Sequence, residues 1–169
     1  MVPAKQDQDI VVQVTRNFKN INISLPKLKK LVNAVCHRFA SSETPNIRYE
    51  VSIAIVDDAQ IRKLNSQFLN RKTTTDCLSF DLSEDGKESV VGNTGSRIFE
   101  LVVNGEMAVR QANLRGHSSE AELALYITHG LLHNLGFDDS IQTQARTMHD
   151  TEDEILQQLG YGFVYNKGI

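Results

Sequence analysis

Apolar and polar residues alternate most regularly between positions 47 and 55. The polar members are Arg48, Glu50 and Ser52, and the apolar members are Ile47, Tyr49, Val51, Ile53 and Ile55. A period of two places all the apolar side chains on one face of an extended chain. The segment therefore predicts a strand with one buried face. Shorter apolar runs predict further strands at residues 10–14, 76–81 and 98–104.

Apolar residues at helical spacing predict helices between and after these strands. The first covers residues 25–40 behind an expected N-cap at Ser24, and the second begins after Asp57 or Asp58. Their apolar stripes consist of Leu28, Leu31, Val35 and Phe39 in the first helix and Ile61, Leu64 and Phe68 in the second. Further helices are predicted at residues 106–114, from Ser118 or Ser119 to 135, and at residues 140–159.

Turn-forming residues between positions 82 and 97 predict a long surface loop or a short hairpin. The chain contains no internal repeat and no proline-rich linker. Strands and helices in this order predict one α+β domain over residues 1–169, with a mixed sheet of about four strands packed against helices.

The helix expected around residues 121–135 is apolar on almost every side, which predicts a central position in the fold. It carries two polar exceptions, His129 and His133. Residues four apart share a helix face, so both imidazoles can bind one metal ion. A buried polar group without a partner costs about 1–3 kcal/mol, and one divalent cation satisfies both rings.

The residues after the second histidine complete a candidate metal site. The segment reads HGLLHNLGFDD from His129 to Asp139. Gly136 permits a sharp chain reversal, which lets Asp139 return as a third ligand. Asp138 and His149 are the alternatives for this third position. Three protein ligands leave the fourth position of zinc open, which is the pattern of catalytic sites.

Gly130 separates this motif from the zinc proteases. In the HExxH motif the residue after the first histidine is a glutamate that acts as general base. Glycine has no side chain that accepts a proton, so a metallopeptidase is the weaker hypothesis.

Composition and charge narrow the class of protein further. A charged fraction of 23% and a hydrophobic fraction of 40% are ordinary for a globular protein. No apolar run reaches the roughly 20 residues of a membrane helix, and the polar first residues show no export signal. Cys36 and Cys77 form no CxxC pair, so we expect reduced thiols and a cytoplasmic location. The net charge of −3 indicates no general affinity for nucleic acid.

The motif and its surroundings resemble the YbeY family of metal-dependent endoribonucleases. The family signature is HGxLHxxGxDH, and residues 75–80 are similar to its TDVLSF strand. Other similar blocks, in the same order, are Leu64-Asn65, Gly105-Glu106-Met107, Gln111-Ala112, Glu122-Leu123, Met148 and residues 152–156. The resemblance covers roughly residues 51–160.

This resemblance implies a metal-dependent endoribonuclease that acts on single-stranded RNA in rRNA maturation, ribosome biogenesis and quality control. It implies one zinc ion per chain, with other divalent metals possible, and a ribosome or small-subunit ribosomal protein as partner. Two positions depart from the family pattern. Asp139 replaces the final histidine, and Leu69 stands where the family usually has an arginine. Arg71 or Lys72 is the candidate substitute for that arginine.

Several residues are candidates for holding the RNA backbone. The basic candidates are Arg62, Arg71, Lys72, Arg110 and Arg115. Ser79 can reach the site from the end of its strand. His129, His133 and Asp139 would hold the metal and carry the catalysis, with either water or the ribose 2′-hydroxyl as nucleophile. The alternative is a non-catalytic, metal-stabilised RNA-binding or ribosome-binding protein.

Overall fold

A mixed β-sheet carries the helices in the computed structural model, which describes residues 10–39, 46–83, 89–91 and 94–165. Its strands are β1 (Ile10–Arg16), β2 (Asn46–Val56), β3 (Cys77–Asp81), β4 (Ser89–Val91) and β5 (Thr94–Asn104). The order in the sheet is β1-β2-β5-β3, with β4 also paired to β5. The β1–β2 and β2–β5 pairs are parallel, and β3 and β4 run antiparallel to β5.

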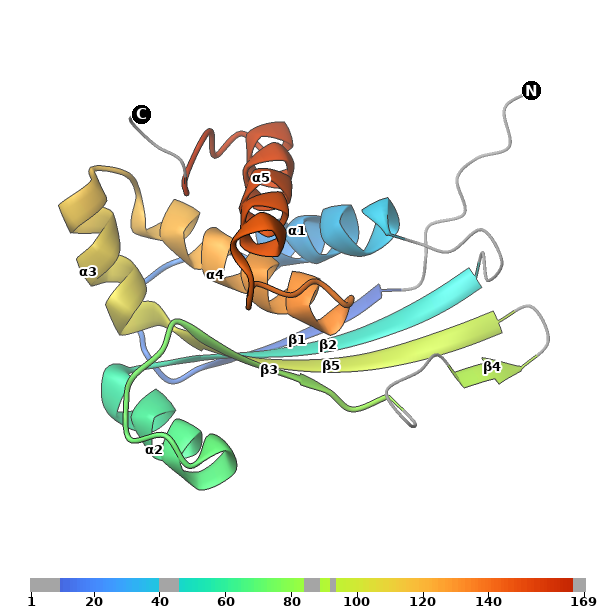
Figure 1. Ribbon diagram of the computed structural model, residues 1–169, viewed down its shortest axis with the longest axis horizontal. Coiled ribbons are helices and arrows are strands. Elements are labelled where there is room, and N and C mark those ends of the chain that lie inside the picture. The colour runs from blue at the N-terminus through green and yellow to red at the C-terminus, as the bar shows by residue number, and fades with distance from the viewer. Residues whose placement is uncertain (1–9, 40–45, 84–88, 92–93, 166–169) are drawn as a thin grey trace.

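Helices cover both faces of this sheet unequally. They are α1 (Leu25–Arg38), α2 (Asp58–Leu69), α3 (Gly105–Arg115), α4 (Ser119–Asn134) and α5 (Gln142–Gln158). Figure 1 shows α1, α4 and α5 on one side of the sheet and α2 on the other. The predicted α+β class and mixed sheet are confirmed. Among the described helices, none is both long enough and apolar enough to cross a membrane.

Local chemistry explains where the helices begin and end. The side chains of Ser24, Asp57 and Ser118 each accept a backbone N–H of the first turn, so Asp57 and Ser118 are the caps among the predicted alternatives. Gly116 ends α3 in the left-handed conformation, with φ of 73°. The N-caps of α1, α2 and α4 were therefore predictable from sequence.

The alternating pattern of β2 places its apolar side chains on the face that α1 and α4 cover. Tyr49, Val51, Ile53 and Ile55 are at most 1% exposed. The apolar positions of β5 join them, namely Phe99, Leu101 and Val103. Helix α4 lies on this layer and buries almost every side chain between Ala121 and Leu132. Its predicted central position is confirmed.

Most element boundaries differ from the sequence-based expectation by one or two residues, and β5 differs by more. Strand β5 begins at Thr94 rather than 98, because β2 is long enough to pair with it along eleven residues. The short β4 pairs with the start of β5, so the hairpin alternative for residues 82–97 is correct where the structure describes it. Helix α5 begins at Gln142 and ends at Gln158. The end of the first predicted helix, residue 40, lies outside the described residues.

Among the apolar positions predicted for the first two helices, Phe68 is the one that the structure exposes. Phe68 follows the apolar spacing of α2, yet 61% of it is exposed. Helix α2 covers only one end of its sheet face (Figure 1). The small apolar cluster that α2 forms with the sheet includes Ile61 and Leu64 but does not extend to Phe68 in the last turn. Phe68 contacts Phe80 edge-on, with ring centroids 5.7 Å apart.

Candidate metal centre

The last two turns of α4 present two imidazoles to the same side. The helix buries residues 121–128 and 130–132, but the side chains of His129 and His133 retain 17% and 30% exposure. Their Nε2 atoms lie 3.1 Å apart. Residues one turn apart in a helix project in nearly the same direction, so the HxxxH spacing produces this convergence directly.

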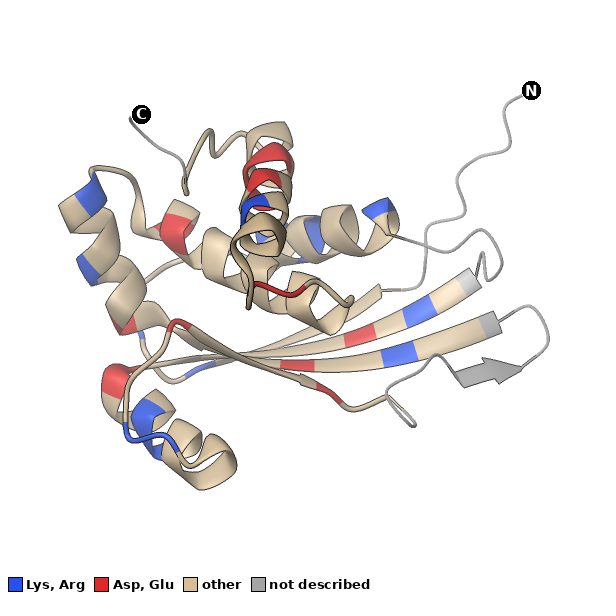
Figure 2. Ribbon diagram, in the orientation of Figure 1, with Lys and Arg blue, Asp and Glu red and all other residues tan. Residues whose placement is uncertain are grey.

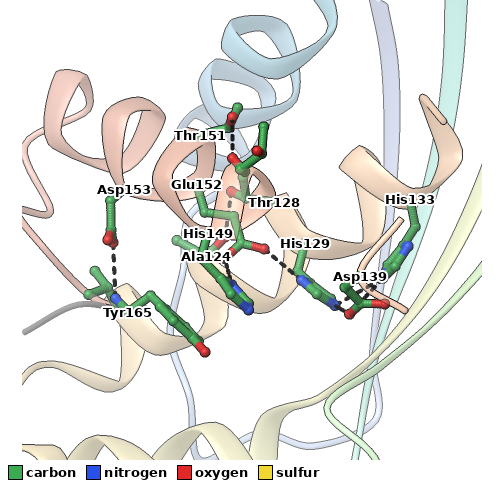
Figure 3. Close-up of polar contacts among 12 residues, drawn as sticks. Ala124, Thr128, His129, His133, Asp139, His149, Thr151, Glu152, Asp153 and Tyr165 are labelled. Atoms are coloured by element: carbon green, nitrogen blue, oxygen red, sulfur yellow. Dashed lines mark hydrogen bonds and ion pairs between the residues drawn. The ribbon is translucent and has the colours of Figure 1, made fainter. Parts of the chain in front are cut away.

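Gly136 turns the chain back toward these histidines. Its φ is +103°, a conformation that L side chains rarely adopt. The N–H of Gly136 donates to the carbonyl of His133, and that of Phe137 donates to the carbonyl of Leu132. This pair of bonds is a Schellman motif, which ends α4 and reverses the chain. Asp139 is thereby brought back to the imidazoles (Figure 3).

The three donor atoms form a triangle suited to one cation. Oδ2 of Asp139 lies 3.6 Å from Nε2 of His129 and 3.5 Å from Nε2 of His133. Ligands about 2.0–2.2 Å from a tetrahedral zinc lie roughly 3.3 Å from one another. Nitrogen and carboxylate donors are also the types that zinc accepts, so the donor set fits the ion. The Asp139 side chain is 40% exposed, which leaves the site open to solvent.

Each imidazole is oriented by a bond on its other nitrogen. Nδ1 of His129 lies 2.6 Å from Oε1 of Glu152, and Nδ1 of His133 lies 3.1 Å from the carbonyl oxygen of Phe137. A hydrogen on Nδ1 leaves the Nε2 lone pair free for a metal. Both rings are therefore held in the tautomer and direction that metal binding requires.

Glu152 also sets the charge balance at His129. Burial by itself lowers the pKa of His129, but the hydrogen bond and charge of Glu152, helped by Asp76 and Asp139, outweigh it and raise the pKa. In the protonated imidazolium the second proton sits on Nε2, the atom that would bind a cation. A cation must displace that Nε2 proton, so metal binding strengthens as the pH rises.

The two alternatives for the third ligand are engaged elsewhere. The Asp138 carboxylate accepts the backbone N–H and the hydroxyl of Ser140, both at 3.0 Å. Nδ1 of His149 lies 2.9 Å from Oε2 of Glu152. His129, His149 and Glu152 form a second cluster of potential ligands. In this second cluster the Glu152 carboxylate already contacts both imidazoles, and only 1% of its side chain is exposed. The triangle that includes Asp139 is open to solvent and therefore fits a cation better.

Strand β3 runs beside α4 and brings Ser79 near the site. Two residues before Ser79, Cys77 lies close to Gly130 of α4. Two residues after it, the carboxylate of Asp81 pairs with Arg97, and the Arg97 guanidinium donates to the carbonyl of Asn134 at the end of α4. Alternate residues of a strand share a face, so Ser79 points toward the last turns of α4. This position suits its predicted contact with substrate.

The basic candidates differ in availability. Arg71 and Lys72 are exposed in the connection from α2 to β3, and among the described residues neither forms an ion pair. Arg110 pairs with Asp58 at 2.8 Å. Arg115 donates to the carbonyls of Val164 and Tyr165. Arg62 is exposed on α2, and Figure 2 shows basic positions spread over several elements rather than gathered at the site.

Gly130 is closed off by the sheet. A Cβ at this position would lie 2.7 Å from Sγ of Cys77 and 3.0 Å from Cδ2 of Leu101. The residue after the first histidine therefore faces the sheet, so a side chain there, such as the glutamate of the proteases, has no room to extend.

The sequence-based prediction missed Glu152, although a signal for it was present. Glu152 occupies the apolar stripe of α5 between Met148 and Ile155, and a carboxylate at such a position requires a buried partner. Asp76, the first residue of the predicted strand, has no predicted role, yet its charge helps to raise the pKa of His129. Nothing in the local sequence marks Tyr165, whose ring stacks on His149.

Comparison with known proteins places this geometry in a family. Residues 13–160 match the family model described as Endoribonuclease YbeY. A relative of that name from Carboxydothermus hydrogenoformans is 38% identical over 110 residues, covering 65% of this chain and 72% of the relative. Another from Moorella thermoacetica is 34% identical over 137 residues, covering 79% and 88%.

A solved structure supports the fold. The solution structure of a protein from Thermotoga maritima superposes with a TM-score of 0.53 at 20% identity, covering 88% of this chain and 91% of that chain. At this identity the likeness concerns the fold alone, whereas the family match runs from the middle of β1 through the other strands, the histidine helix and all of α5. The chain belongs to the YbeY endoribonuclease family.

Proposed function

We propose that this protein is a metal-dependent endoribonuclease that cleaves single-stranded regions of rRNA precursors. The observation that carries the proposal is the triangle of His129, His133 and Asp139, with donor separations of 3.1, 3.6 and 3.5 Å. The names of the relatives support the reaction class, since they are called endoribonucleases. One zinc ion per chain fits the donors, and other divalent ions of similar ligand preference are possible.

The protein residues would have three roles: they hold the metal ion, orient its ligands and bind the RNA. A bound cation supplies Lewis-acid chemistry, which polarises a phosphoryl oxygen and makes a bound water more acidic. His129, His133 and Asp139 hold the ion, and Glu152 keeps the Nδ1 proton of His129 in place. Ser79 offers a hydroxyl at the strand beside α4, and Arg71 and Lys72 offer exposed cations for phosphate.

Among the described residues, Arg110, unlike Arg71 and Lys72, already has an acidic partner. Its guanidinium bonds both carboxylate oxygens of Asp58, at 2.8 and 3.3 Å. Asp58 in turn accepts the side-chain amide of Asn104 and the hydroxyl of Thr74. Arg110 therefore supports the connection that carries Arg71 and Lys72, and its contact with phosphate is the weaker part of the proposal.

The wider role follows the family. We propose rRNA maturation, ribosome biogenesis and quality control as the process, with a ribosome or small-subunit ribosomal protein as partner and a cytoplasmic location. Residues 1–169 would act as one domain. Leu69 replaces the usual arginine and is 50% exposed, so it offers apolar contact instead of phosphate binding.

One experiment tests the proposal directly. Purified wild type, His133→Ala and His37→Ala are analysed for zinc content by mass spectrometry and for cleavage of a structured rRNA fragment with single-stranded ends. His37 lies on α1, outside the metal triangle, and serves as the matched control. We expect zinc and cleavage in wild type and His37→Ala and neither in His133→Ala. Zinc-loaded wild type that binds the RNA but cuts no faster than His133→Ala would establish the non-catalytic alternative.

A metallopeptidase is the less supported alternative. Its general base would stand at Gly130, where the sheet leaves no space for a side chain. Turnover of casein by the same preparations, without RNA cleavage, would reverse this conclusion.

A further inference from the structure

The ring of Tyr165 lies at the outer end of a series of aromatic rings that begins at the metal triangle. The centroids of Tyr165 and His149 are 3.5 Å apart and their planes differ by 7°. The ring of His149 is nearly parallel to that of His129, with centroids 6.1 Å apart and an angle of 11°. Figure 3 shows the three side chains in sequence, with Tyr165 farthest from Asp139.

The backbone around Tyr165 is anchored from two helices. Arg115 of α3 donates to the carbonyls of Val164 and Tyr165, both at 2.6 Å. The N–H of Tyr165 donates to Oδ1 of Asp153 on α5 at 3.0 Å. Val164 is 1% exposed and belongs to the core. These contacts hold the segment firmly, so the Tyr165 ring is presented in one place.

The anchored ring is nevertheless not part of the core. Tyr165 is 41% exposed, although an aromatic ring gains most by full burial. His149 stacks on one face of the ring, and among the described residues no second ring stacks on the other face. A cavity of about 240 Å³ adjoins the pair, and Arg146 and Asp150 also line it. Arg146 is a possible phosphate partner, whereas the carboxylate of Asp150 disfavours phosphate on its own side and leaves an uncharged base unaffected.

We propose that Tyr165, backed by His149, is a stacking platform for one nucleobase of single-stranded RNA beside the site of cleavage. This inference rests on the proposed ribonuclease function and adds a substrate subsite to it. Every nucleobase has a flat π face, so such a platform accepts any sequence. Bases within a duplex are already stacked and paired, so the platform favours single strands.

The position of the platform suits a strand that passes the metal triangle. Two ring separations, 6.1 and 3.5 Å, lead from His129 to Tyr165, a reach that a few nucleotides of extended strand span. A base stacked on Tyr165 would fix the register of the strand, and thus which phosphate meets the metal. The ring is therefore a positioning residue for cleavage as well as a source of affinity.

Binding of a short fluorescent single-stranded RNA tests this platform. Wild type, Tyr165→Leu and Tyr165→Phe are compared by fluorescence anisotropy, with zinc content measured for each. We expect Tyr165→Leu to raise Kd about tenfold, as loss of one base–aromatic stack does, and Tyr165→Phe to stay within about twofold. Equal Kd values for wild type and Tyr165→Leu would overturn the proposal.

The RNA itself supplies a second test, whose first measurement uses wild type alone. An abasic nucleotide is moved along the strand one position at a time. Wild type should lose affinity most at one position, and at that position Tyr165→Leu should lose little more. A uniform loss at all positions in wild type contradicts a localised platform.

A tryptophan reporter gives a direct signal of stacking. The chain contains no tryptophan, so Tyr165→Trp introduces a single emitter. RNA binding should quench its fluorescence, and unchanged emission at saturating RNA counts against the platform. These binding measurements are independent of turnover. If wild type and His133→Ala cleave equally, the ribonuclease proposal fails, while the Kd comparison still decides the role of Tyr165.

Discussion

Nδ1 of His129 lies 2.6 Å from a carboxylate oxygen of Glu152, which is buried between α4 and α5. The second oxygen of the same carboxylate lies 2.9 Å from Nδ1 of His149. One buried anion thus links a candidate metal ligand to the last helix, which lies outside the HxxxHxxGxxD segment. The geometry of this candidate metal centre consequently depends on residues that its motif does not contain.

Substitution of Glu152 tests this dependence. Glu152→Gln keeps the shape of the side chain but removes its charge, so His129 loses the partner that orients it and raises its pKa. We expect zinc affinity to fall about 10–100-fold, as for other carboxylates behind metal-bound histidines. Competition with a chromophoric chelator measures the change. Glu154→Gln is the control, since the Glu154 side chain is 58% exposed on the same helix. Equal affinities for both variants would show that the ring is positioned by packing alone.

Asp139 and Asp138 can be told apart by parallel substitutions. Asp139→Ala should lose most of the bound zinc, whereas Asp138→Ala should only loosen the turn in which its carboxylate caps Ser140. Asp139→His replaces the carboxylate with another donor that zinc accepts and should retain zinc. Zinc content by mass spectrometry distinguishes these outcomes. Full zinc in Asp139→Ala, or loss of zinc in Asp139→His, is incompatible with Asp139 as a ligand.

Chelation should lower thermal stability, because the cation joins the end of α4 to the turn that carries Asp139. At free zinc 100 times its Kd, binding adds about 2.7 kcal/mol, or roughly 5–10 °C in Tm for a protein of this size. Thermal unfolding followed by circular dichroism with and without chelator measures the shift. His133→Ala should melt at the same temperature in both conditions. A wild-type curve that chelator leaves unchanged would refute the link.

Gly130→Ala tests the contact between α4 and β3. The new Cβ would meet Sγ of Cys77 at 2.7 Å, and overpacking of this kind costs about 1–3 kcal/mol, offset by about 1 kcal/mol of helix propensity. We expect a net loss of about 1 kcal/mol in urea unfolding. Cys77→Ala removes the obstructing sulfur, so the double variant should lose less than the sum of the single variants. Strict additivity would mean that the sulfur moves aside freely.

The ion pair between Asp81 and Arg97 should make stability depend on pH. Burial by itself raises the pKa of Asp81, but hydrogen bonds from Ser83 and Arg97 outweigh it and lower the pKa below its usual range. A lowered folded-state pKa contributes stability above the unfolded pKa of about 4, and this contribution is lost as the pH falls through the folded-state value. Wild type should therefore exceed Asp81→Asn in unfolding free energy at neutral pH, by about 1–3 kcal/mol.

That difference should stay constant down to about pH 5 and shrink at lower pH. Denaturant unfolding at a series of pH values measures it. Glu50→Gln is a surface control, because its carboxylate is 46% exposed beside Arg48. A difference between wild type and Asp81→Asn that persists unchanged in acid would assign the stability to packing instead of charge.

Short-range patterns predicted most of the elements and part of the site. The alternation in residues 47–55, the caps Ser24 and Ser118 and the HxxxH spacing all act within a few residues, where backbone geometry determines which side chains share a face. Gly136 likewise predicted the chain reversal that brings Asp139 back to the histidines. The errors came where another element decided the outcome. Phe68 is exposed because α2 covers only part of its face, and β5 is longer because β2 offers it a partner.

His129 and His133 meet through local geometry, since side chains four residues apart lie on the same face of every helix, and the sequence is enough to predict this pair. Packing of the helices and the sheet brings Glu152 to His129, β3 to α4 and Tyr165 to His149. Those pairs join elements far apart along the chain. Their meeting depends on how the helices pack on the sheet, a sum of many weak contacts that no spacing along one segment encodes.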